Sequence, residues 1–463
     1  MKDFTQKTIN EVNLGSDGFV DIRFQEAESL TLNIRNGLTE EVTSTRIGGA
    51  AARALIGGAW GFATTAEISK DSLKNILKSA VTMAKVASEK IKEPRKIDSK
   101  FSSKGTFKLD FDVNPKDISI EEKMNLTLDL EKNISKVDER IANSSATYLE
   151  SVQTETIISS NGTDVTTDSG VFRLSGRAVG REGNLQQNVG DNIASSVGIK
   201  TILDWNVTEK GTEIGETAIG LLSAEKPLSG KMNLIMDPSL VGVFVHEAFG
   251  HACEADGIIT KRSILHDKLN KEVGIKEINI ADDPTIPGLR GTFVFDSEGT
   301  KTQKRKLVTN GILTEFFHTL ETASLMGLKP NGAGRAMDFR FPPLARMGNT
   351  YVEAGDKNLD ELFEIVGNGM YLEKSYGGYV NPSQGQFMFS AQNGYIIENG
   401  EKKALTQNVS MSGLIMEVLA NTMGVGKDES PAFNGSCGKG GQWVPVTGGG
   451  PSLAVKDLVV GGR

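Results

Sequence analysis

The 463-residue chain has little of several residue types that mark whole classes of protein. Its two cysteines cannot form a disulfide framework, which favours a reduced, cytoplasmic compartment where a thiol stays available as a ligand. No apolar run approaches the roughly 18 residues of a membrane span, and residues 1–7 lack the apolar core of a signal peptide. The net charge of −8 argues against nucleic acid as a main partner, because binding phosphates requires clustered Lys and Arg.

The remaining composition is that of an ordinary globular chain with enough residues for more than one core. Hydrophobic residues make up 38% and charged residues 24%, so a chain of this length has enough apolar side chains to form large buried cores. A Pro- and Gly-containing segment near residues 226–230 precedes a strand-like run and predicts a boundary there. We therefore expect an N-terminal α+β domain at 1–226, with a possible sub-boundary near 93–105, and a C-terminal domain at 227–463.

Turn signals are spread along the whole chain between runs that favour β-structure. Asn-Gly pairs predict type I′ hairpin turns. These pairs are Asn36-Gly37, Asn161-Gly162, Asn310-Gly311 and Asn399-Gly400. They predict largely antiparallel sheets.

Helical patterns interrupt these runs without a regular βαβ rhythm. Apolar spacing predicts helices from Ser69 to about Lys92, from Ser119 to about Val137, and from Asn358 to about Tyr371. The second and third begin with capping boxes, in which a side chain and the backbone three residues later bond reciprocally. A further helix is expected from Met411 towards Gly424. The fold class we predict is α+β, with mixed, largely antiparallel sheets and interspersed helices in a two-domain chain.

Two of the four histidines flank a carboxylate within a single short segment. His246 is followed directly by Glu247, and His251 comes five positions after His246. Imidazoles are borderline-soft ligands that suit zinc, and a neighbouring unligated Glu can act as a general base. On a regular helix, however, five residues turn about 500°, which leaves the two rings roughly 140° apart. A single π-bulge absorbs one extra residue, so a helix with such a bulge lets both rings face one metal.

The residues around this segment indicate where its helix starts and stops. Asp237-Pro238 predicts the start, because Pro is favoured in the first turn. Gly257 is the expected stop. Gly250 loosens the helix locally and allows a close approach by the metal or a neighbouring backbone.

Cys437 is the candidate third ligand, and it stands in the glycine-rich segment 435–441. We expect a loop here, because such a segment offers few side chains for a core and its backbone can bend around a metal. Glu254 lies on the helical face of His251 and either orients that imidazole or replaces Cys437 as the third ligand. Arg335 is a candidate for substrate binding or oxyanion stabilisation, and a structural salt bridge is the alternative. Cys253 points away from His251 on a helix and is expected to be structural.

These motifs occur in the order found in the TldD/PmbA family of metallopeptidases, which the chain resembles across nearly its whole length. The most specific match is the pairing of HExxxH with a late Cys-Gly-Lys. The matching segments are Arg46–Gly49, Gly58–Ala63, His246–His251 with Glu254 and Asp256, Gly334-Arg335, Cys437–Val446, Gly450-Pro451 and Val459–Gly462. Because all candidate ligands are present, the chain resembles the catalytic TldD-type subunit.

The resemblance implies one zinc ion per chain, held by His246, His251 and Cys437, with Glu247 as the general base. It also implies a dimer, either a homodimer or a heterodimer with a PmbA-type subunit, and unfolded peptides as substrates. The resulting hypothesis is a zinc-dependent peptidase of unfolded or extended peptides. The alternatives are a non-catalytic peptide-binding or regulatory partner with structural zinc, and a hydrolase of non-peptide amides. Glu247 favours the peptidase, because structural zinc has no need of a general base.

Overall fold

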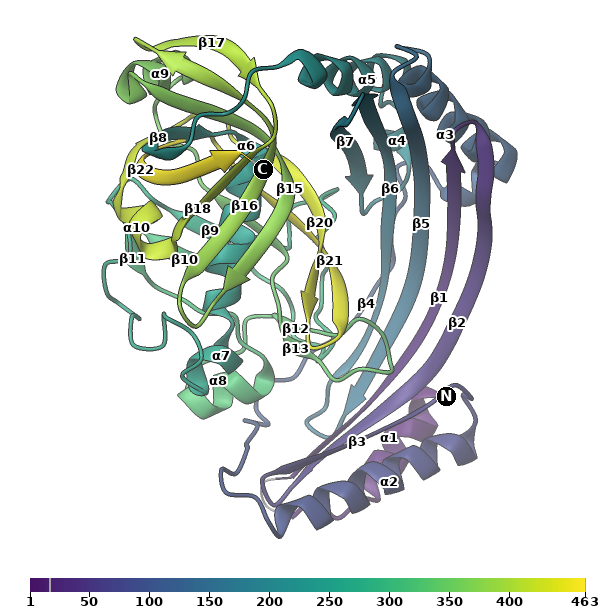
Figure 1. Ribbon diagram of the computed structural model, residues 1–463. Helices are drawn as coiled ribbons and strands as arrows, with labels where there is room; N and C mark the ends of the chain where they lie inside the picture. Colours follow the sequence, from purple (N-terminus) through teal and green to yellow (C-terminus); the bar gives the residue numbers. More distant parts are fainter. Residues whose placement is uncertain (16–17, 463) are drawn as a thin grey trace.

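The computed structural model describes residues 1–15 and 18–462, and it has two lobes (Figure 1). A long curved sheet forms the N-terminal lobe, and shorter strands with several helices form the C-terminal lobe. The strand pairings are largely antiparallel with helices between them, so the predicted α+β class is confirmed. The division at residues 226/227 and the sub-boundary near 93–105 stay predictions.

The N-terminal sheet has the strand order β3-β2-β1-β5-β6-β4, with β7 paired to β6. Its strands are β1 Phe19–Arg35, β2 Leu38–Ile56, β3 Ala59–Thr65, β4 Lys104–Phe107, β5 Ile141–Ser159, β6 Asp164–Glu182 and β7 Leu185–Ser195. The helices of this lobe are α1 Lys2–Asn10, α2 Lys70–Ser88, the 3₁₀ turn η1 Pro115–Asp117, α3 Ile120–Ser135, α4 Lys200–Leu203 and α5 Val207–Ser223.

The two faces of β6 have different roles. Phe172 and Leu174 are buried in a cluster with Leu130 of α3 and Ile214 of α5, so this face carries the core. Side chains alternate along a strand, and Arg173 therefore lies on the opposite face of the sheet. That face is turned towards the C-terminal lobe (Figure 1).

The C-terminal lobe contains two larger sheets and a two-stranded one, β12-β13. One has the order β11-β10-β9-β14-β21-β20, and its strands are β9 Ile280–Asp282, β10 Arg305–Thr309, β11 Ile312–Leu313, β14 Asn349–Val352, β20 Ser430–Lys439 and β21 Gln442–Gly450. The other has the order β15-β8-β22-β18-β16-β17 with β19 on β22, and its strands are β8 Gly230–Met236, β15 Gly369–Asn381, β16 Gln386–Glu398, β17 Glu401–Thr406, β18 Val409–Leu414, β19 Thr422–Val425 and β22 Leu453–Gly462. The small sheet pairs β12 Gly334–Arg335 with β13 Leu344–Ala345.

The helices of the C-terminal lobe are mostly short, and one of them lies in its core. They are α6 Pro238–Val243, the π-helix η2 Phe244–Gly250, the 3₁₀ turn η3 His251–Cys253, α7 Ala255–Ile259, α8 Leu320–Met326, α9 Leu359–Val366 and α10 Ile415–Ala420. Val241 of α6 and Phe244 and Phe249 of η2 are fully buried in the largest apolar cluster, which draws residues from both larger sheets. The candidate metal site is therefore built on a segment held rigidly by packing. Among the described residues, no helix combines the length and apolar character needed to cross a membrane.

Three of the four predicted Asn-Gly turns have the expected conformation. Both residues have positive φ at Asn36-Gly37, Asn310-Gly311 and Asn399-Gly400, as a type I′ turn requires, and each joins an antiparallel pair. Asn161-Gly162 also lies between two antiparallel strands, β5 and β6, but only its glycine has positive φ. The type I′ prediction was wrong at that turn.

The helix starts were predicted better than the helix ends. The boxes at Ser119 with Glu122 and at Asn358 with Glu361 both form. The helix expected to reach Tyr371 ends at Val366, because Gly369–Asn381 pairs as strand β15 between β8 and β16. The helix expected from Met411 was also wrong over its first part, since Val409–Leu414 is strand β18, paired with β16 and β22.

Candidate metal centre

The helix that carries both histidines starts where the sequence predicted. The Asp237 carboxylate caps α6 by accepting a hydrogen bond from the Leu240 backbone N–H at 2.8 Å, and Pro238 occupies the first turn. Burial raises the pKa of Asp237 to about 6, although hydrogen bonds from the Lys374 and Leu240 backbones act in the opposite direction. The helix continues from α6 directly into η2.

The expected deformation of the helix is present between the two histidines. Residues Phe244–Gly250 form a π-helix, whose wider turns absorb the fifth residue of the spacing. The two imidazole centroids lie 5.4 Å apart and their planes meet at 83°. The predicted stop at Gly257 was wrong: the chain leaves the helix at Glu254, which is extended, and Gly257 lies within the short α7.

Gly250 is required by a close neighbour and not by an unusual backbone conformation. Its φ of −59° is helical. A Cβ at this position would lie 2.0 Å from the Met347 sulfur, so any side chain would displace Met347. The close approach that the sequence suggested is therefore made by a side chain.

Three potential metal ligands come together at this point of the C-terminal lobe. One nitrogen from His246, one from His251 and the Cys437 sulfur all lie within 4.8 Å of one another. The Nε2 atom of His251 is 3.5 Å from Cys437 Sγ. Tetrahedral zinc at ordinary bond lengths separates its ligands by roughly 3.3–3.7 Å, so this distance fits one shared ion.

Cys437 reaches the site from a strand, and the predicted loop was wrong. Ser430–Lys439 forms β20, which pairs with β21, and the chain turns only at Gly440-Gly441. Alternation along β20 places the Cys437 side chain inward, where it is fully buried. The buried guanidinium of Arg346 donates a hydrogen bond to the Cys437 carbonyl and helps to fix this strand.

The two histidines differ in the partners of their ring nitrogens. His251 Nδ1 lies 3.1 Å from Glu254 Oε2, an arrangement that leaves Nε2 directed towards Cys437. His246 is fully buried, and neither of its ring nitrogens has a hydrogen-bond partner among the described residues. Such a nitrogen is costly to bury unless it binds a ligand, and a soft cation suits this donor set.

Charge in the site favours the forms that bind a cation. Burial alone would raise the pKa of the Cys437 thiol, but the imidazoles of His246 and His251 lower it to about 5. Burial would likewise raise the pKa of Glu254, but His251 and Lys439 lower it to about 2. Lys439 Nζ lies 2.9 Å from Glu254 Oε2, which connects this carboxylate to both β20 and η3.

Glu247 is the most accessible member of the group. Its side chain is 28% exposed, whereas that of His251 is 11% exposed, and its Oε2 lies 3.8 Å from His251 Nε2. A carboxylate here can reach both the shared ligand position and solvent. That is the placement a general base requires.

The other residues singled out in the sequence lie in different surroundings. Arg335 is buried, donates a hydrogen bond to the Met347 carbonyl at 2.6 Å and stacks over Phe293. Burial and Arg346 lower the pKa of Arg335 to about 9. No ion pair to Arg335 is found among the described residues, so the salt-bridge alternative lacks support, and a role in substrate binding stays a prediction. Cys253 is fully buried in the apolar core, as expected of a structural residue.

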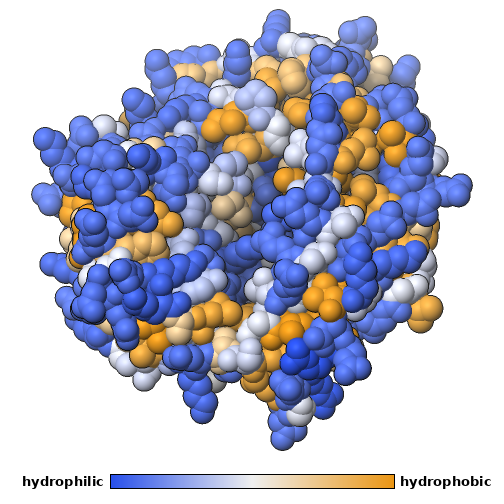
Figure 2. All heavy atoms as spheres, turned by 90° about the horizontal axis from the view of Figure 1, so that it is seen from above, coloured by the Kyte–Doolittle hydropathy of each residue, from blue (hydrophilic) through white to orange (hydrophobic). Residues whose placement is uncertain are grey.

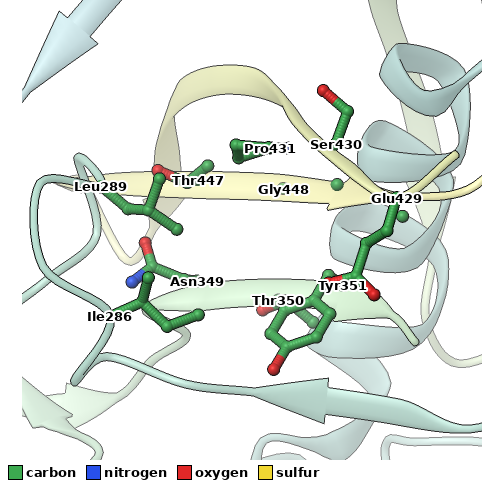
Figure 3. A pocket seen from close by; sticks show the side chains of 12 residues that line it. Ile286, Leu289, Asn349, Thr350, Tyr351, Glu429, Ser430, Pro431, Thr447 and Gly448 are labelled. Atoms are coloured by element: carbon green, nitrogen blue, oxygen red, sulfur yellow. The ribbon is translucent and has the colours of Figure 1, made fainter. Parts of the chain in front are cut away.

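Several arginines that surround the site carry no recognisable sequence signal. Arg346, Arg290 and Arg173 come from segments far apart in the chain, and no motif or spacing marks them. Only the fold brings them near β20. An apolar pocket of about 170 Å³ also lies near this sheet, between Ile286 and Leu289 on one side and β14 and β21 on the other (Figure 3).

Comparison with known proteins covers nearly the whole chain. Family models match at residues 20–84 (PmbA/TldA metallopeptidase domain 1), 113–222 (central domain) and 229–462 (C-terminal domain). A metalloprotease of Archaeoglobus fulgidus is 36% identical over 96% of this chain and 99% of its own length. A protein of Saccharolobus solfataricus named zinc metalloprotease TldD homolog is 30% identical, over 96% of each chain.

Solved structures share the fold at lower identity. A Thermotoga maritima protein described as a modulator of DNA gyrase is 23% identical, with a TM-score of 0.79 over 99% of each chain. TldE from Thermococcus kodakarensis is 18% identical, with a TM-score of 0.73 over 100% of this chain and 99% of its own. With three family models in order and relatives above 30% identity along almost the full length, the chain belongs to the PmbA/TldD metallopeptidase family.

Proposed function

We propose that this protein is a zinc-dependent peptidase that hydrolyses unfolded or extended peptides. The observation that carries the proposal is the pair of buried, unpartnered ring nitrogens of His246 beside the Cys437 sulfur. His246, His251 and Cys437 would hold the ion, and Glu247 would act as the base. Three protein ligands favour a catalytic site, because structural zinc takes four and catalytic zinc keeps one position open.

In this proposal the protein's own groups orient the ligands and move the proton. Bound zinc would supply a Lewis acid at the scissile carbonyl and would lower the pKa of water. Glu247 accepts a proton from the attacking water and passes it to the leaving amine. Glu254 holds the His251 ring through Nδ1, and Lys439 holds Glu254 in turn.

The strand that carries Cys437 supports binding of an extended substrate. Strand β20 is the last strand of its sheet, so its outer edge has backbone groups available to another strand. A peptide added there would bind through main-chain hydrogen bonds with little demand on side chains. A tightly folded protein offers no such free segment, and this predicts loose sequence preference with selection for unfolded chains.

The assembly of the protein is also part of the proposal. We propose the catalytic TldD-type role in a cytoplasmic dimer, formed by two copies of this chain or with a PmbA-type subunit. The presence of all three ligands and of Glu247 supports the catalytic role. Native mass spectrometry of this chain, alone and with a PmbA-type chain, would distinguish the two assemblies by mass.

Metal analysis combined with peptide cleavage tests the proposed function. Purified protein should carry about one zinc per chain and cleave an unstructured peptide. Chelation should abolish cleavage and stoichiometric zinc should restore it. Metal-free protein with undiminished cleavage would overturn the proposal. Zinc binding without cleavage of any unfolded peptide would instead favour a non-catalytic, peptide-binding protein.

Substrate form is tested with one polypeptide in two states. A stable domain and its core-destabilised variant would be offered at equal concentration, with folding checked by circular dichroism in assay buffer. We expect cleavage of the unfolded variant only. Equal rates on the two would contradict the argument from strand addition and indicate recognition of a surface motif.

A further inference from the structure

Arg290 is a buried arginine whose charge has no partner among the described residues. It is only 7% exposed, and its Nη2 donates one hydrogen bond, to Ser436 Oγ at 3.2 Å. Its Nε and Nη1 atoms are buried without any hydrogen-bond partner in the described chain. An unpaired buried guanidinium is costly, so a partner is expected from outside the chain.

A second arginine belongs to the part of the other lobe that approaches β20. Arg173 is paired with Ala194 of β7, and β7 contacts β20, the strand that carries the Ser436 partner of Arg290. Arg173 of β6 has a buried Nε that also lacks a partner within the described residues. Burial and, to a smaller extent, the charge of Arg173 lower the pKa of Arg290 to about 10. Two cations that influence each other in this way repel, and an anion bound by both would offset that repulsion.

Several other buried arginines of this chain form ion pairs with carboxylates. Arg305 is fully buried and forms an ion pair with Asp282, and Arg53 pairs with both Asp21 and Glu298. Arg335 is also buried without an ion pair, but it donates a hydrogen bond to the Met347 carbonyl and stacks over Phe293. Arg290 and Arg173 differ from it because each has at least one buried guanidinium nitrogen with neither a carboxylate nor a hydrogen-bond partner in the described residues.

The arginine pair lies where a substrate strand would pass. Ser436 is exposed and immediately precedes Cys437 on β20, the edge strand proposed to bind the peptide. Strand β20 lies on the side of its lobe that faces β6 and β7 (Figure 1). Seen from above, the surface is hollowed between the lobes, and the hollow is coloured mainly as hydrophilic residues (Figure 2). Alternation along β20 directs Ser436 to the face opposite Cys437.

We propose that Arg290, Arg173 and the Ser436 hydroxyl form a subsite for a carboxylate of the bound peptide, beside the metal centre. Guanidinium groups bind carboxylates through paired, charge-assisted hydrogen bonds, and the hydroxyl supplies a further donor at the exposed rim. The carboxylate is either the C-terminus of the peptide or an Asp or Glu side chain at one position. This inference rests on the proposed peptidase function and narrows its substrate class to peptides with a carboxylate at a set distance from the cleaved bond.

Binding to an inactive protein tests the subsite without relying on cleavage. A fluorescent unstructured peptide would be titrated against the Glu247→Gln protein, as the free acid and as the amide, and with one Asp or Asn moved along its length. We expect one of these carboxylates to tighten binding by roughly 10- to 100-fold over its neutral counterpart, the usual weight of a charge-assisted contact. The comparison of free acid with amide tests the C-terminal carboxylate, and the comparison of Asp with Asn tests a side-chain carboxylate, so the two together identify which carboxylate binds. Equal affinity of every acid and neutral pair would overturn the subsite.

Arginine variants connect the preference to these residues. Arg290→Gln and Arg173→Gln, each combined with Glu247→Gln, should lose the acid-over-neutral ratio. Arg181→Gln is the matched control, because Arg181 lies on the same strand β6 but contacts the Gly183 carbonyl. A preference that survives in both Arg290→Gln and Arg173→Gln, with zinc content and melting temperature retained, would refute the assignment.

Cleavage by the active protein separates this inference from the function on which it rests. With Glu247 intact, the acidic peptide should show a lower KM than its neutral counterpart at similar kcat. Cleavage of both peptides with equal KM would remove the subsite and leave the peptidase in place. Carboxylate-dependent binding without cleavage of either peptide would remove the peptidase and leave the subsite.

Discussion

The metal centre and the junction between the lobes are both built from buried polar side chains, but their atoms are satisfied in opposite ways. At the junction, Arg53 of β2 lies 2.9 Å from Asp21 of β1 and 3.0 Å from Glu298 of the C-terminal lobe. Glu298 also accepts a hydrogen bond from the Leu320 N–H at 2.7 Å. At the metal centre, the His246 nitrogens have no hydrogen-bond partner within the described residues.

Whether buried polar atoms have partners within the chain distinguishes a structural cluster from a binding site. Paired charges at the junction hold two parts of the chain together, and burial does not leave them unsatisfied. Potential metal-ligating atoms that converge without hydrogen-bond partners, as at His246 and Cys437, are tolerated in a folded protein when a bound ligand interacts with them. The comparison therefore predicts that variants at the metal centre change metal and activity, whereas variants at the junction change stability.

The largest effect is expected for Cys437→Ala. Removing the only sulfur of the group should lower zinc content sharply and reduce peptide cleavage to the level of chelated protein. Metal analysis and a peptide assay measure the two effects. Full retention of zinc would exclude Cys437 as a ligand and promote Glu254 to that role.

Glu247→Gln should separate catalysis from metal binding. The substitution keeps size and hydrogen bonding but removes the base, so cleavage should fall by about 10²- to 10⁴-fold, the usual share of general base catalysis. Zinc content should not change. Turnover near that of the unsubstituted protein would show that another group takes the proton.

Arg53→Met should weaken the fold and leave the site chemistry intact. Loss of the guanidinium leaves Asp21 and Glu298 buried without a cationic partner, which should lower the free energy of unfolding by about 3–5 kcal/mol. Arg46→Gln on the same strand is the control, because Arg46 is 70% exposed and its ion pairs are worth about 0–1 kcal/mol. Denaturant unfolding compares the two. Equal losses would mean that the junction does not depend on its buried charges.

His318 sharpens the comparison, because it is buried with an unpartnered Nε2 but belongs to no group of metal ligands among the described residues. Burial lowers its pKa from 6.5 to about 4. Its contribution to the unfolding free energy is therefore fully present above about pH 6.5 and is lost as the pH falls towards 4. The loss should reach about 2 kcal/mol at pH 5.

The difference in stability between the unsubstituted protein and His318→Gln measures this loss, with chelator present so that acid release of metal does not contribute. His266→Gln provides an exposed control. A difference that stays constant between pH 7 and pH 5 would contradict the assignment to His318.

Local chemistry explains what the sequence could predict. An Asn-Gly pair such as Asn36-Gly37 sets its own turn, and a capping box such as that of Ser119 needs only four consecutive residues. The π-helix followed from the same kind of reasoning, because the five-residue spacing of His246 and His251 restricts how both rings can face one point.

Strand pairing and the packing of the two lobes explain what the sequence could not predict. Met411 lies in a run with helical apolar spacing, but its segment pairs as a strand with β16 on one side and with β22, about 40 residues further along the chain, on the other. Cys437 was expected in a loop, but it lies in one strand of the β20–β21 hairpin, and only Gly440-Gly441 of that glycine-rich segment form the turn. The proximity of Arg173 and Arg290 depends on how the two lobes meet, which no local pattern encodes.

The π-helix also has a consequence for how this site can change through insertion or deletion of a single codon. A π-turn is an α-turn that has gained one residue, so one in-frame codon separates the spacing of His246 and His251 from the four-residue spacing of a regular helix. Insertion within a buried helix normally rotates every later side chain out of register. Here the bulge confines that rotation to Phe244–Gly250, and the widened turn coincides with the residues that would hold the metal. A single-codon change at this point can therefore redesign a metal centre without rebuilding the protein around it.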